Sequence, residues 1–228
     1  MGEKIIAQGA EAIIIKEGTE IIKKRIKKSY RIKELDDKIR KQRTRSEAKL
    51  LEKASKIISI PELIKTDDEQ MEISMEFING KKLSEELNSF SLEKQKQICF
   101  QIGESTAKLH DKDIIHGDLT TSNIILKEKD LDFNRRQLKK SCSVPKGEID
   151  KEKLGSLYFI DFGLGFNSHR IEDKAVDLHL IKQALEAKHF ENWKTLFQSI
   201  KDGYKHSKDS KKVLEQLEKV EKRGRYKH

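Results

Sequence analysis

The sequence contains few cysteines, prolines, glycines and aromatic residues, and several of these shortages exclude a class of protein. Its two cysteines, Cys99 and Cys142, are too few for a disulfide scaffold or a four-thiolate zinc site. Two prolines and 12 glycines among 228 residues exclude collagen-like and Pro/Gly-rich chains. No apolar run approaches the roughly 18 residues that a membrane-spanning helix needs, so we expect no membrane segment.

What remains is a highly charged chain that can still form a core. Charged residues make up 38% of the sequence, against roughly 25% in a typical soluble domain. The apolar residues are mostly Ile and Leu in periodic clusters, which favours a folded protein. The segment Met1–Lys4 lacks the apolar centre of a secretory signal, so we expect an intracellular, cytoplasmic protein.

The positive charge, +9 overall, is concentrated in two segments. Residues 23–45 hold 12 basic and three acidic side chains, and residues 205–228 hold nine basic and four acidic ones. Such patches attract polyanions, and Tyr30 and Tyr226 within them can stack on unpaired bases. The alternative is a lysine-rich helix face exposed to water, which a charge run alone does not exclude.

The hydrophobic pattern predicts a strand-rich beginning followed by helices. We expect strands over residues 5–6, 12–16, 20–26, 62–65, 72–77 and 157–160, and helices over residues 33–56, 91–110, 175–187, 190–207 and 211–221. Residues 127–155 differ from both, with nine basic and six acidic side chains and few large apolar ones. We interpret them as a solvent-exposed, partly disordered excursion between two strands, the alternative being a short basic helix over residues 131–140.

The most informative segment is His116–Asn123, which is followed by an apolar strand and then by Asp161–Gly163. This order resembles the catalytic loop and metal-binding turn of kinase-like enzymes. Asp118 lies where a carboxylate can orient a nucleophilic hydroxyl or water. Asn123 and Asp161 supply the hard oxygen ligands that a metal bridging two phosphates requires.

Upstream residues supply the lysine and the acid that such a site needs. Lys23 ends an apolar strand, where it can reach the α- and β-phosphates of ATP, and Glu47 lies in a helix from which it can hold that lysine. Lys24 competes for the role, but adjacent residues on a strand face opposite ways. Two alternatives stay open at this point: Lys23 could be a solvated side chain, and Glu47 could form a surface salt bridge.

Two further segments are expected to contact ATP. The phosphate-covering loop should be formed by Gln8, Gly9, Ala10, Glu11 and Ala12, although it has one glycine rather than three. The segment that joins the two lobes should place backbone groups of Glu76 and Ile78 against adenine.

Taken together, the chain resembles the small atypical kinase of the KEOPS (EKC) complex, the PRPK family, in its archaeal-like form. The resemblance rests on nine segments: Gln8–Ala12, Ile22–Arg25, Tyr30–Arg31, Arg43–Thr44, Glu47–Ala48, His116–Asn123, Ile160–Leu164, Glu172–Leu178 and Arg223–Arg225. It covers nearly the whole chain. The departure is the excursion at residues 127–155, where family members usually have a short turn.

The resemblance implies an α+β, two-lobed, protein-kinase-like fold, with a small β-rich N-lobe at residues 1–77 and a reduced helical C-lobe at residues 78–228. It implies an atypical Ser/Thr kinase that uses ATP with Mg²⁺, or with Mn²⁺, and whose ATP hydrolysis supports threonylcarbamoyladenosine formation in tRNA. The implied partners are a Kae-type synthase subunit, a small regulatory subunit on the N-lobe, and tRNA. The tail with Arg223, Arg225 and Tyr226 is implied to serve tRNA binding.

The segment after the metal-binding turn argues against ordinary peptide substrates. Only 13 residues, 164–176, separate Gly163 from Asp177, and no Ala-Pro-Glu occurs. Gly117 stands where many kinases have the arginine that pairs a phosphate on this segment. ATP hydrolysis, or phosphorylation of a bound partner, is therefore favoured.

Three other interpretations compete with this one. A relative of aminoglycoside or choline kinases would carry a large helical substrate domain, whereas 65 residues follow Gly163. A RIO-type ribosome-assembly kinase is a second alternative. A non-catalytic tRNA-binding scaffold is disfavoured because all five expected active-site side chains are present: Lys23, Glu47, Asp118, Asn123 and Asp161.

Overall fold

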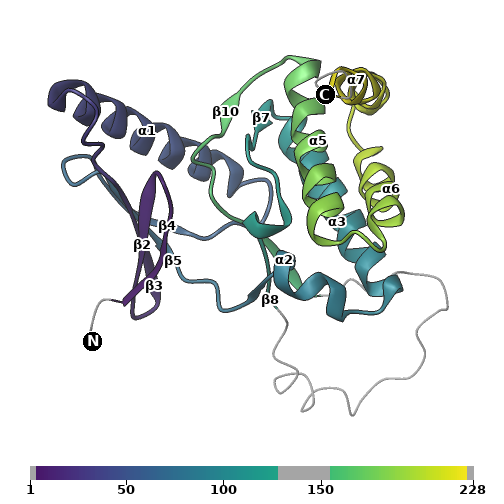
Figure 1. The fold of residues 1–228 in the computed structure, drawn as a ribbon, viewed down its shortest axis with the longest axis horizontal. Coiled ribbons are helices and arrows are strands. Elements are labelled where there is room, and N and C mark those ends of the chain that lie inside the picture. The colour runs from purple at the N-terminus through teal and green to yellow at the C-terminus, as the bar shows by residue number, and fades with distance from the viewer. Residues whose placement is uncertain (1–3, 128–154, 225–228) are drawn as a thin grey trace, which may run out of the picture.

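The computed structural model describes residues 4–127 and 155–224. A sheet crossed by one long helix lies on one side, and a group of packed helices lies on the other (Figure 1). Apart from Lys127 and Gly155, the predicted excursion at residues 127–155 lies outside the described residues, and so does Cys142. The arrangement is α+β, with a sheet-rich N-lobe and a helical C-lobe, as the sequence predicts.

The N-lobe is a five-stranded antiparallel sheet with the strand order β1-β2-β3-β5-β4. Its elements are β1 (Lys4–Gln8), β2 (Ala12–Glu17), β3 (Glu20–Arg25), the helix α1 (Lys33–Ala54), β4 (Leu63–Asp67) and β5 (Glu72–Glu76). In the register, Lys23 on β3 lies between Ile14 on β2 and Ile73 on β5. The central strand therefore carries Lys23 in the middle of the sheet.

The C-lobe is built mainly from helices. Its elements are β6 (Lys81–Lys82), α2 (Leu83–Glu86), the 3-10 turn η1 (Leu87–Ser89), α3 (Leu92–His110), β7 (Ile114–Ile115), the 3-10 turn η2 (Thr121–Asn123), β8 (Ile124–Lys127), β9 (Ser156–Phe159), β10 (Phe166–Asn167), α5 (Ile171–Lys188), α6 (Trp193–Tyr204) and α7 (Ser210–Gly224). β8 and β9 pair with Ile124 opposite Phe159, and the Ile160 amide donates to the Asn123 carbonyl at 2.9 Å. This pairing brings the end of the 116–123 loop beside the 161–163 turn.

Most expected elements are found, and the differences have local causes. Residues 33–54 form one helix, and Ser91 caps α3 by accepting a hydrogen bond from the Lys94 amide. α6 begins at Trp193 rather than at residue 190, because Phe190 is exposed and contributes nothing to the core. The two-residue strands β6, β7 and β10 are too short to give a hydrophobic period.

The helices of the C-lobe pack closely because two glycines face each other across α3 and α6. A Cβ added at Gly103 would lie 2.1 Å from the carbonyl oxygen of Ile200, and one added at Gly203 would lie 2.1 Å from that of Phe100. Real Cβ atoms do not approach backbone so closely, so the two helices would have to separate. The buried core that they enclose includes Cys99, as expected, and continues into α1.

We predict that Gly103→Ala lowers the free energy of unfolding by about 3 kcal/mol, because the added methyl group collides with backbone that cannot rotate away. Urea denaturation of the two proteins measures the change. Gly9→Ala is the control, since its Cβ would approach only the Ala12 carbonyl oxygen, at 3.8 Å. Equal stability of wild type and Gly103→Ala would mean that the helices are less tightly packed than described.

Candidate active site

A buried lysine joins the two lobes. Lys23 Nζ lies 2.6 Å from Glu47 Oε1 on α1 and 2.7 Å from Asp161 Oδ1, which follows β9. Lys23 is 6% exposed and Glu47 is 2% exposed. Burial alone would lower the pKa of Lys23, but the carboxylates of Glu47 and Asp161 outweigh it and raise the pKa above its ordinary value.

Asp161 is held as a carboxylate by its surroundings. Burial alone would raise its pKa, but the ammonium group of Lys23, a hydrogen bond from that group and another from the Gly163 amide lower the pKa overall. The backbone of Asp161 has a φ of +63°, in the left-handed region that non-glycine residues rarely adopt. That conformation and the 3.1 Å bond from the Gly163 amide fix the direction of the carboxylate.

Lys24, the competitor considered from the sequence, faces the other side of the sheet. Its Nζ lies 2.6 Å from Glu72 Oε1 on the neighbouring strand β5. Strand alternation thus separates the two lysines, and Lys23 is the one that meets Glu47.

A buried carboxylate on α5 holds the loop over residues 116–123 in place. Asp177 on α5 accepts hydrogen bonds from the amides of His116 at 2.6 Å and Gly117 at 2.8 Å. His110 Nε2 lies 3.2 Å from the same carboxylate, and His110 Nδ1 lies 2.9 Å from the hydroxyl of Tyr204. Three helices, α3, α5 and α6, therefore converge on one anchor of the loop.

Gly117 is required by two features of its surroundings. Its φ is +78°, and an added Cβ would lie 2.2 Å from the carbonyl oxygen of Leu164. The segment after the 161–163 turn passes so close to the loop that no side chain fits at this position.

His116 and Phe162 connect the loop to the turn at residues 161–163. Their ring centroids are 4.6 Å apart, and both side chains are buried. Burial lowers the pKa of His116, which keeps the ring neutral. Its Nε2 lies 3.2 Å from the Ile160 carbonyl, and the Asp118 amide donates to its Nδ1, so the proton belongs on Nε2.

Asp118 and Asn123 form a pair at the mouth of the site. The Asn123 side-chain Nδ2 donates to Asp118 Oδ2 at 2.8 Å and to the Asp118 carbonyl at 2.9 Å. Asn123 thus orients the carboxylate of Asp118 through its Nδ2.

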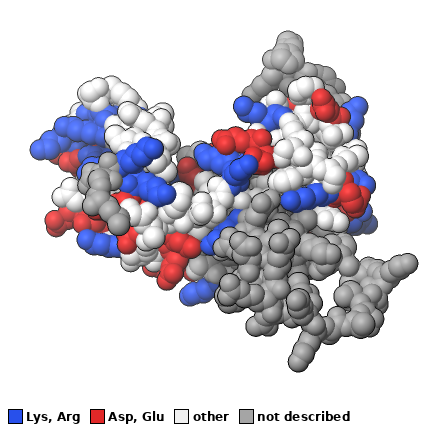
Figure 2. Space-filling model, turned by 90° about the horizontal axis from the view of Figure 1, so that it is seen from below, with Lys and Arg blue, Asp and Glu red and all other residues white. Residues whose placement is uncertain are grey.

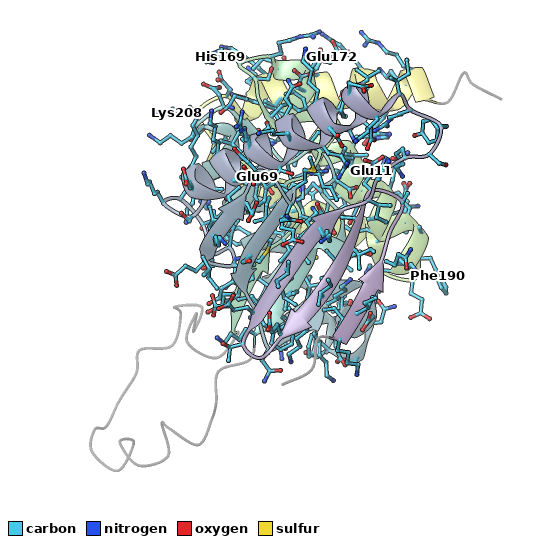
Figure 3. The ribbon with its side chains drawn as sticks, turned by 90° about the vertical axis from the view of Figure 1, so that its left-hand side faces the viewer. Glu11, Glu69, His169, Glu172, Phe190 and Lys208 are labelled. Carbon is cyan, nitrogen blue, oxygen red and sulfur yellow. The ribbon has the colours of Figure 1, made fainter. Side chains whose placement is uncertain are left out.

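The expected phosphate loop lies against α1. The Gly9 amide donates to the Ala12 carbonyl at 2.9 Å, which closes a tight turn. The Glu11 side chain lies 2.7 Å from Arg43 on α1, at the end of the sheet nearest that helix (Figure 3). This ion pair ties the turn to α1 one helical turn before Glu47.

The segment joining the lobes is held by a backbone hydrogen bond and by burial of one side chain. The Glu76 amide donates to the Glu62 carbonyl at 2.9 Å, which favours the carbonyl of Glu76 for any contact with a base. Ile78 is 3% exposed and packs into the interior.

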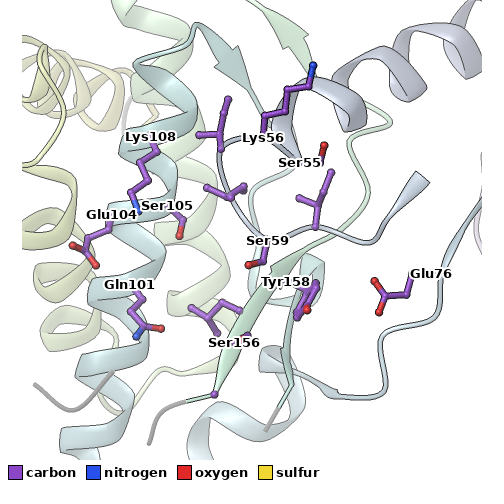
Figure 4. Close-up of a pocket in the computed structure, with 15 residues that line it drawn as sticks. Ser55, Lys56, Ser59, Glu76, Gln101, Glu104, Ser105, Lys108, Ser156 and Tyr158 are labelled. Atoms are coloured by element: carbon purple, nitrogen blue, oxygen red, sulfur yellow. The ribbon is translucent and has the colours of Figure 1, made fainter. Parts of the chain in front are cut away.

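A groove of about 590 Å³ lies next to Glu76 (Figure 4). It is lined by the residues that follow α1, by α3 and by β9. Its lining is mostly polar, and Ser59, Gln101, Ser105 and Tyr158 point toward it. Of the expected ATP-binding residues, only Glu76 lines it. The groove is therefore separate from the Lys23 site.

Four side chains that organise the site had no role predicted from the sequence. These are Arg25, His110, Asp177 and Tyr204. Arg25 is two residues from Lys23 on the same strand and so shares its face, a signal that was available in the alternation. His110, Asp177 and Tyr204 come from three helices, and no local pattern connects them.

The basic segment at residues 23–45 is less free than its charge suggests. Lys23 and Arg25 are buried, Arg43 pairs with Glu11, and Arg45 pairs with Asp68 at 2.6 Å. Lysine and arginine side chains nevertheless gather over the N-lobe end of the face shown in Figure 2. Part of the run is structural, and part remains on the surface.

In the C-terminal tail, Arg223 Nη1 lies 2.5 Å from Glu172 at the start of α5. Arg225 and Tyr226 lie outside the described residues. Within residues 4–127 and 155–224, no helix is long and apolar enough to cross a membrane. The same ranges hold no group of three or more His, Cys, Asp or Glu side chains arranged for a metal ion.

Comparison with known proteins gives concordant results. Residues 4–169 match the protein kinase domain model. The chain is 37% identical to the KEOPS complex subunit Bud32 of Pyrococcus abyssi, over 98% of this chain and 96% of that protein. It is 38% identical to a probable bifunctional tRNA threonylcarbamoyladenosine biosynthesis protein of Methanobrevibacter smithii, over 99% of this chain but 37% of that protein.

Among solved structures, the chain resembles the Rio2 kinase–ADP/Mg²⁺–phosphoaspartate complex from Chaetomium thermophilum. The TM-score is 0.54 with 16% identity, covering 100% of this chain and 71% of that one. This likeness confirms the kinase-like fold that the sequence predicts.

We predict that Asp177→Asn lowers the free energy of unfolding by about 2–3 kcal/mol, because an amide cannot accept from two backbone N–H groups and a histidine as a carboxylate does. Urea denaturation measures the loss. Asp173→Asn on the same helix is the control, since among the described residues the Asp173 side chain accepts a hydrogen bond only from the partly exposed Ser168 hydroxyl, at 2.6 Å. Similar losses in both variants would contradict a special role for Asp177.

Proposed function

Because the chain belongs to the protein kinase domain family and, within it, to the family of the KEOPS complex subunit Bud32, we propose that it transfers or hydrolyses the γ-phosphoryl group of ATP in support of tRNA threonylcarbamoyladenosine biosynthesis. The strongest support is the placement of Lys23 between Glu47 and Asp161. A kinase site needs a strand lysine that is held by a helix acid and lies next to a metal-binding carboxylate.

The residues present fit Mg²⁺ bound together with phosphates. Asp161 supplies a carboxylate held ionised by its lowered pKa, and Asn123 supplies Oδ1 because its Nδ2 is bonded to Asp118. Mg²⁺ typically takes one or two protein oxygens and completes its shell with phosphates and water. When bound, the metal neutralises charge on the β- and γ-phosphates. Mn²⁺ accepts the same oxygen ligands.

Each of the other side chains has a separate task in this proposal. Lys23 binds the α- and β-phosphates, and Glu47 keeps its ammonium group in place. Asp118 orients the attacking hydroxyl or water and accepts hydrogen bonding from it, while Asn123 fixes the direction of its carboxylate. Gln8 to Ala12 cover the phosphates, and the backbone of Glu76 and Ile78 binds adenine.

We further propose that the acceptor is water or a Ser/Thr hydroxyl of a bound partner. The segment at residues 164–176 is short, contains no Ala-Pro-Glu, and passes close to Gly117, where an added Cβ would lie 2.2 Å from the Leu164 carbonyl oxygen. The proposed partners are a Kae-type synthase subunit, a small regulatory subunit on the N-lobe, and tRNA in the cytoplasm. A bifunctional relative that contains the matching part within a longer chain supports a stable association of this kind.

The RIO-type alternative rests on the fold alone. The Rio2 likeness has 16% identity, whereas the Bud32 likeness has 37% over nearly the full length of both chains. The main proposal is therefore the better supported.

We predict that Asp161→Ala and Asp118→Ala both abolish phosphoryl transfer, for different reasons. Loss of Asp161 removes a metal ligand and should weaken Mg-ATP binding, whereas loss of Asp118 should slow turnover by about 100-fold or more with binding largely kept. Calorimetric titration with Mg-ATP and a turnover assay separate the two effects. An equal loss of binding in the two variants would refute the assignment of separate roles.

We predict that deleting residues 225–228 weakens tRNA binding by the assembled complex while folding and Mg-ATP binding stay unchanged. The deletion removes Arg225 and Lys227 but keeps the pair between Arg223 and Glu172. Because fewer counterions are released, the slope of log affinity against log salt should become shallower by about 1–2. Identical affinities and slopes, measured at several salt concentrations, would assign the tail no part in tRNA binding.

A further inference from the structure

Glu47 is shared by two cations rather than bound by one. Its Oε1 meets Lys23 at 2.6 Å, and its Oε2 meets Arg25 Nη2 at 2.6 Å. Arg25 Nη2 also lies 3.4 Å from the main-chain carbonyl of Arg43, one turn earlier on α1. Arg25 therefore contacts both the carboxylate and the backbone of the helix that carries it.

Stability alone does not explain a guanidinium at this position. Arg25 is 5% exposed, and its Nε is buried with no hydrogen-bond partner among the described residues. A buried ion pair of this kind is often no more stabilising than well-packed apolar side chains of the same volume. The charge is better explained by what it does to the position of Glu47.

The need for a second cation follows from the task of Lys23. In this structure Lys23 bridges Glu47 and Asp161. When Mg-ATP binds, Asp161 is required by the metal and the ammonium group of Lys23 must also serve the phosphates. Glu47 would then share its only lysine with a highly charged ligand, and Arg25 gives its carboxylate a partner that does not contact the ligand.

We propose that Arg25 is a positioning residue, which keeps Glu47 and α1 aimed at Lys23 while the lysine engages the phosphates. Many kinases position the equivalent helix through a phosphorylated activation segment. Here Gly117 cannot carry a side chain that would bind such a phosphate, and the clamp on α1 comes from β3 itself. This inference rests on the proposed use of ATP.

The test is a double-mutant cycle of Arg25→Met and Glu47→Gln, assayed for the KM for Mg-ATP and for kcat. We expect Arg25→Met to raise the KM about 10-fold with a smaller change in kcat, because the lysine that binds the phosphates loses its fixed direction. In the Glu47→Gln background the same change should have almost no further effect, because Arg25 acts only through that carboxylate. Arg25→Lys, which keeps the charge, should recover most of the lost affinity.

Lys24→Met is the matched control, since Lys24 neighbours Arg25 on β3 but pairs with Glu72 on the other face, and it should leave the KM unchanged. If Arg25→Met does not fold, Arg25→Gln compared with Arg25→Lys separates charge from packing in the same assay. An unchanged KM in every folded Arg25 variant, effects that add to those of Glu47→Gln, or a loss that Arg25→Lys does not relieve would each overturn the inference. A wild type that neither binds nor turns over Mg-ATP would instead overturn the proposed function.

Discussion

The active site depends on one carboxylate that lies between two buried cations. Lys23 and Arg25 lie at alternate positions of β3, and both are buried. Without Glu47 the two cations would repel each other, and nothing would compensate for the hydration that they lose on burial. Because Glu47 is on α1, the helix must lie against the sheet at the height of Lys23 for either cation to be buried. The position of α1 and the burial of Lys23 and Arg25 are thus two consequences of the same contact, and Asp161 joins Glu47 in raising the pKa of Lys23.

The loop over residues 116–123 is held differently, by hydrogen bonds from its backbone amides to a buried carboxylate. Asp177 binds two successive amides, so the direction of the chain at His116 and Gly117 is set before Asp118 is reached. The glycine contact between α3 and α6 then matters for the site as well as for stability. It places His110 on α3 within reach of Tyr204 on α6, and His110 in turn contacts Asp177.

Site residues could be predicted from the sequence where they lie close together along the chain. The 116–123 loop, the 161–163 turn and the alternation of Lys23 and Lys24 could be recognised because spacing along one element determines what faces what. The strands and helices followed from hydrophobic period in the same way. Alternation also places Arg25 on the face of Lys23, whereas the convergence of His110, Tyr204 and Asp177 could not be recognised, because it depends on how separate helices pack.

Charge is the property for which sequence and structure differ most. Counted along the chain, residues 23–45 carry a single strong basic run, yet the fold divides it between two environments. Lys23 and Arg25 turn inward and pair with Glu47, whereas Lys27, Lys33 and Lys38 are exposed. A field that attracts a polyanion arises only from charges that remain hydrated and uncompensated. Any attraction of the N-lobe for a polyanion would therefore come from the outer part of the run, while its inner part pairs with the buried carboxylate of Glu47.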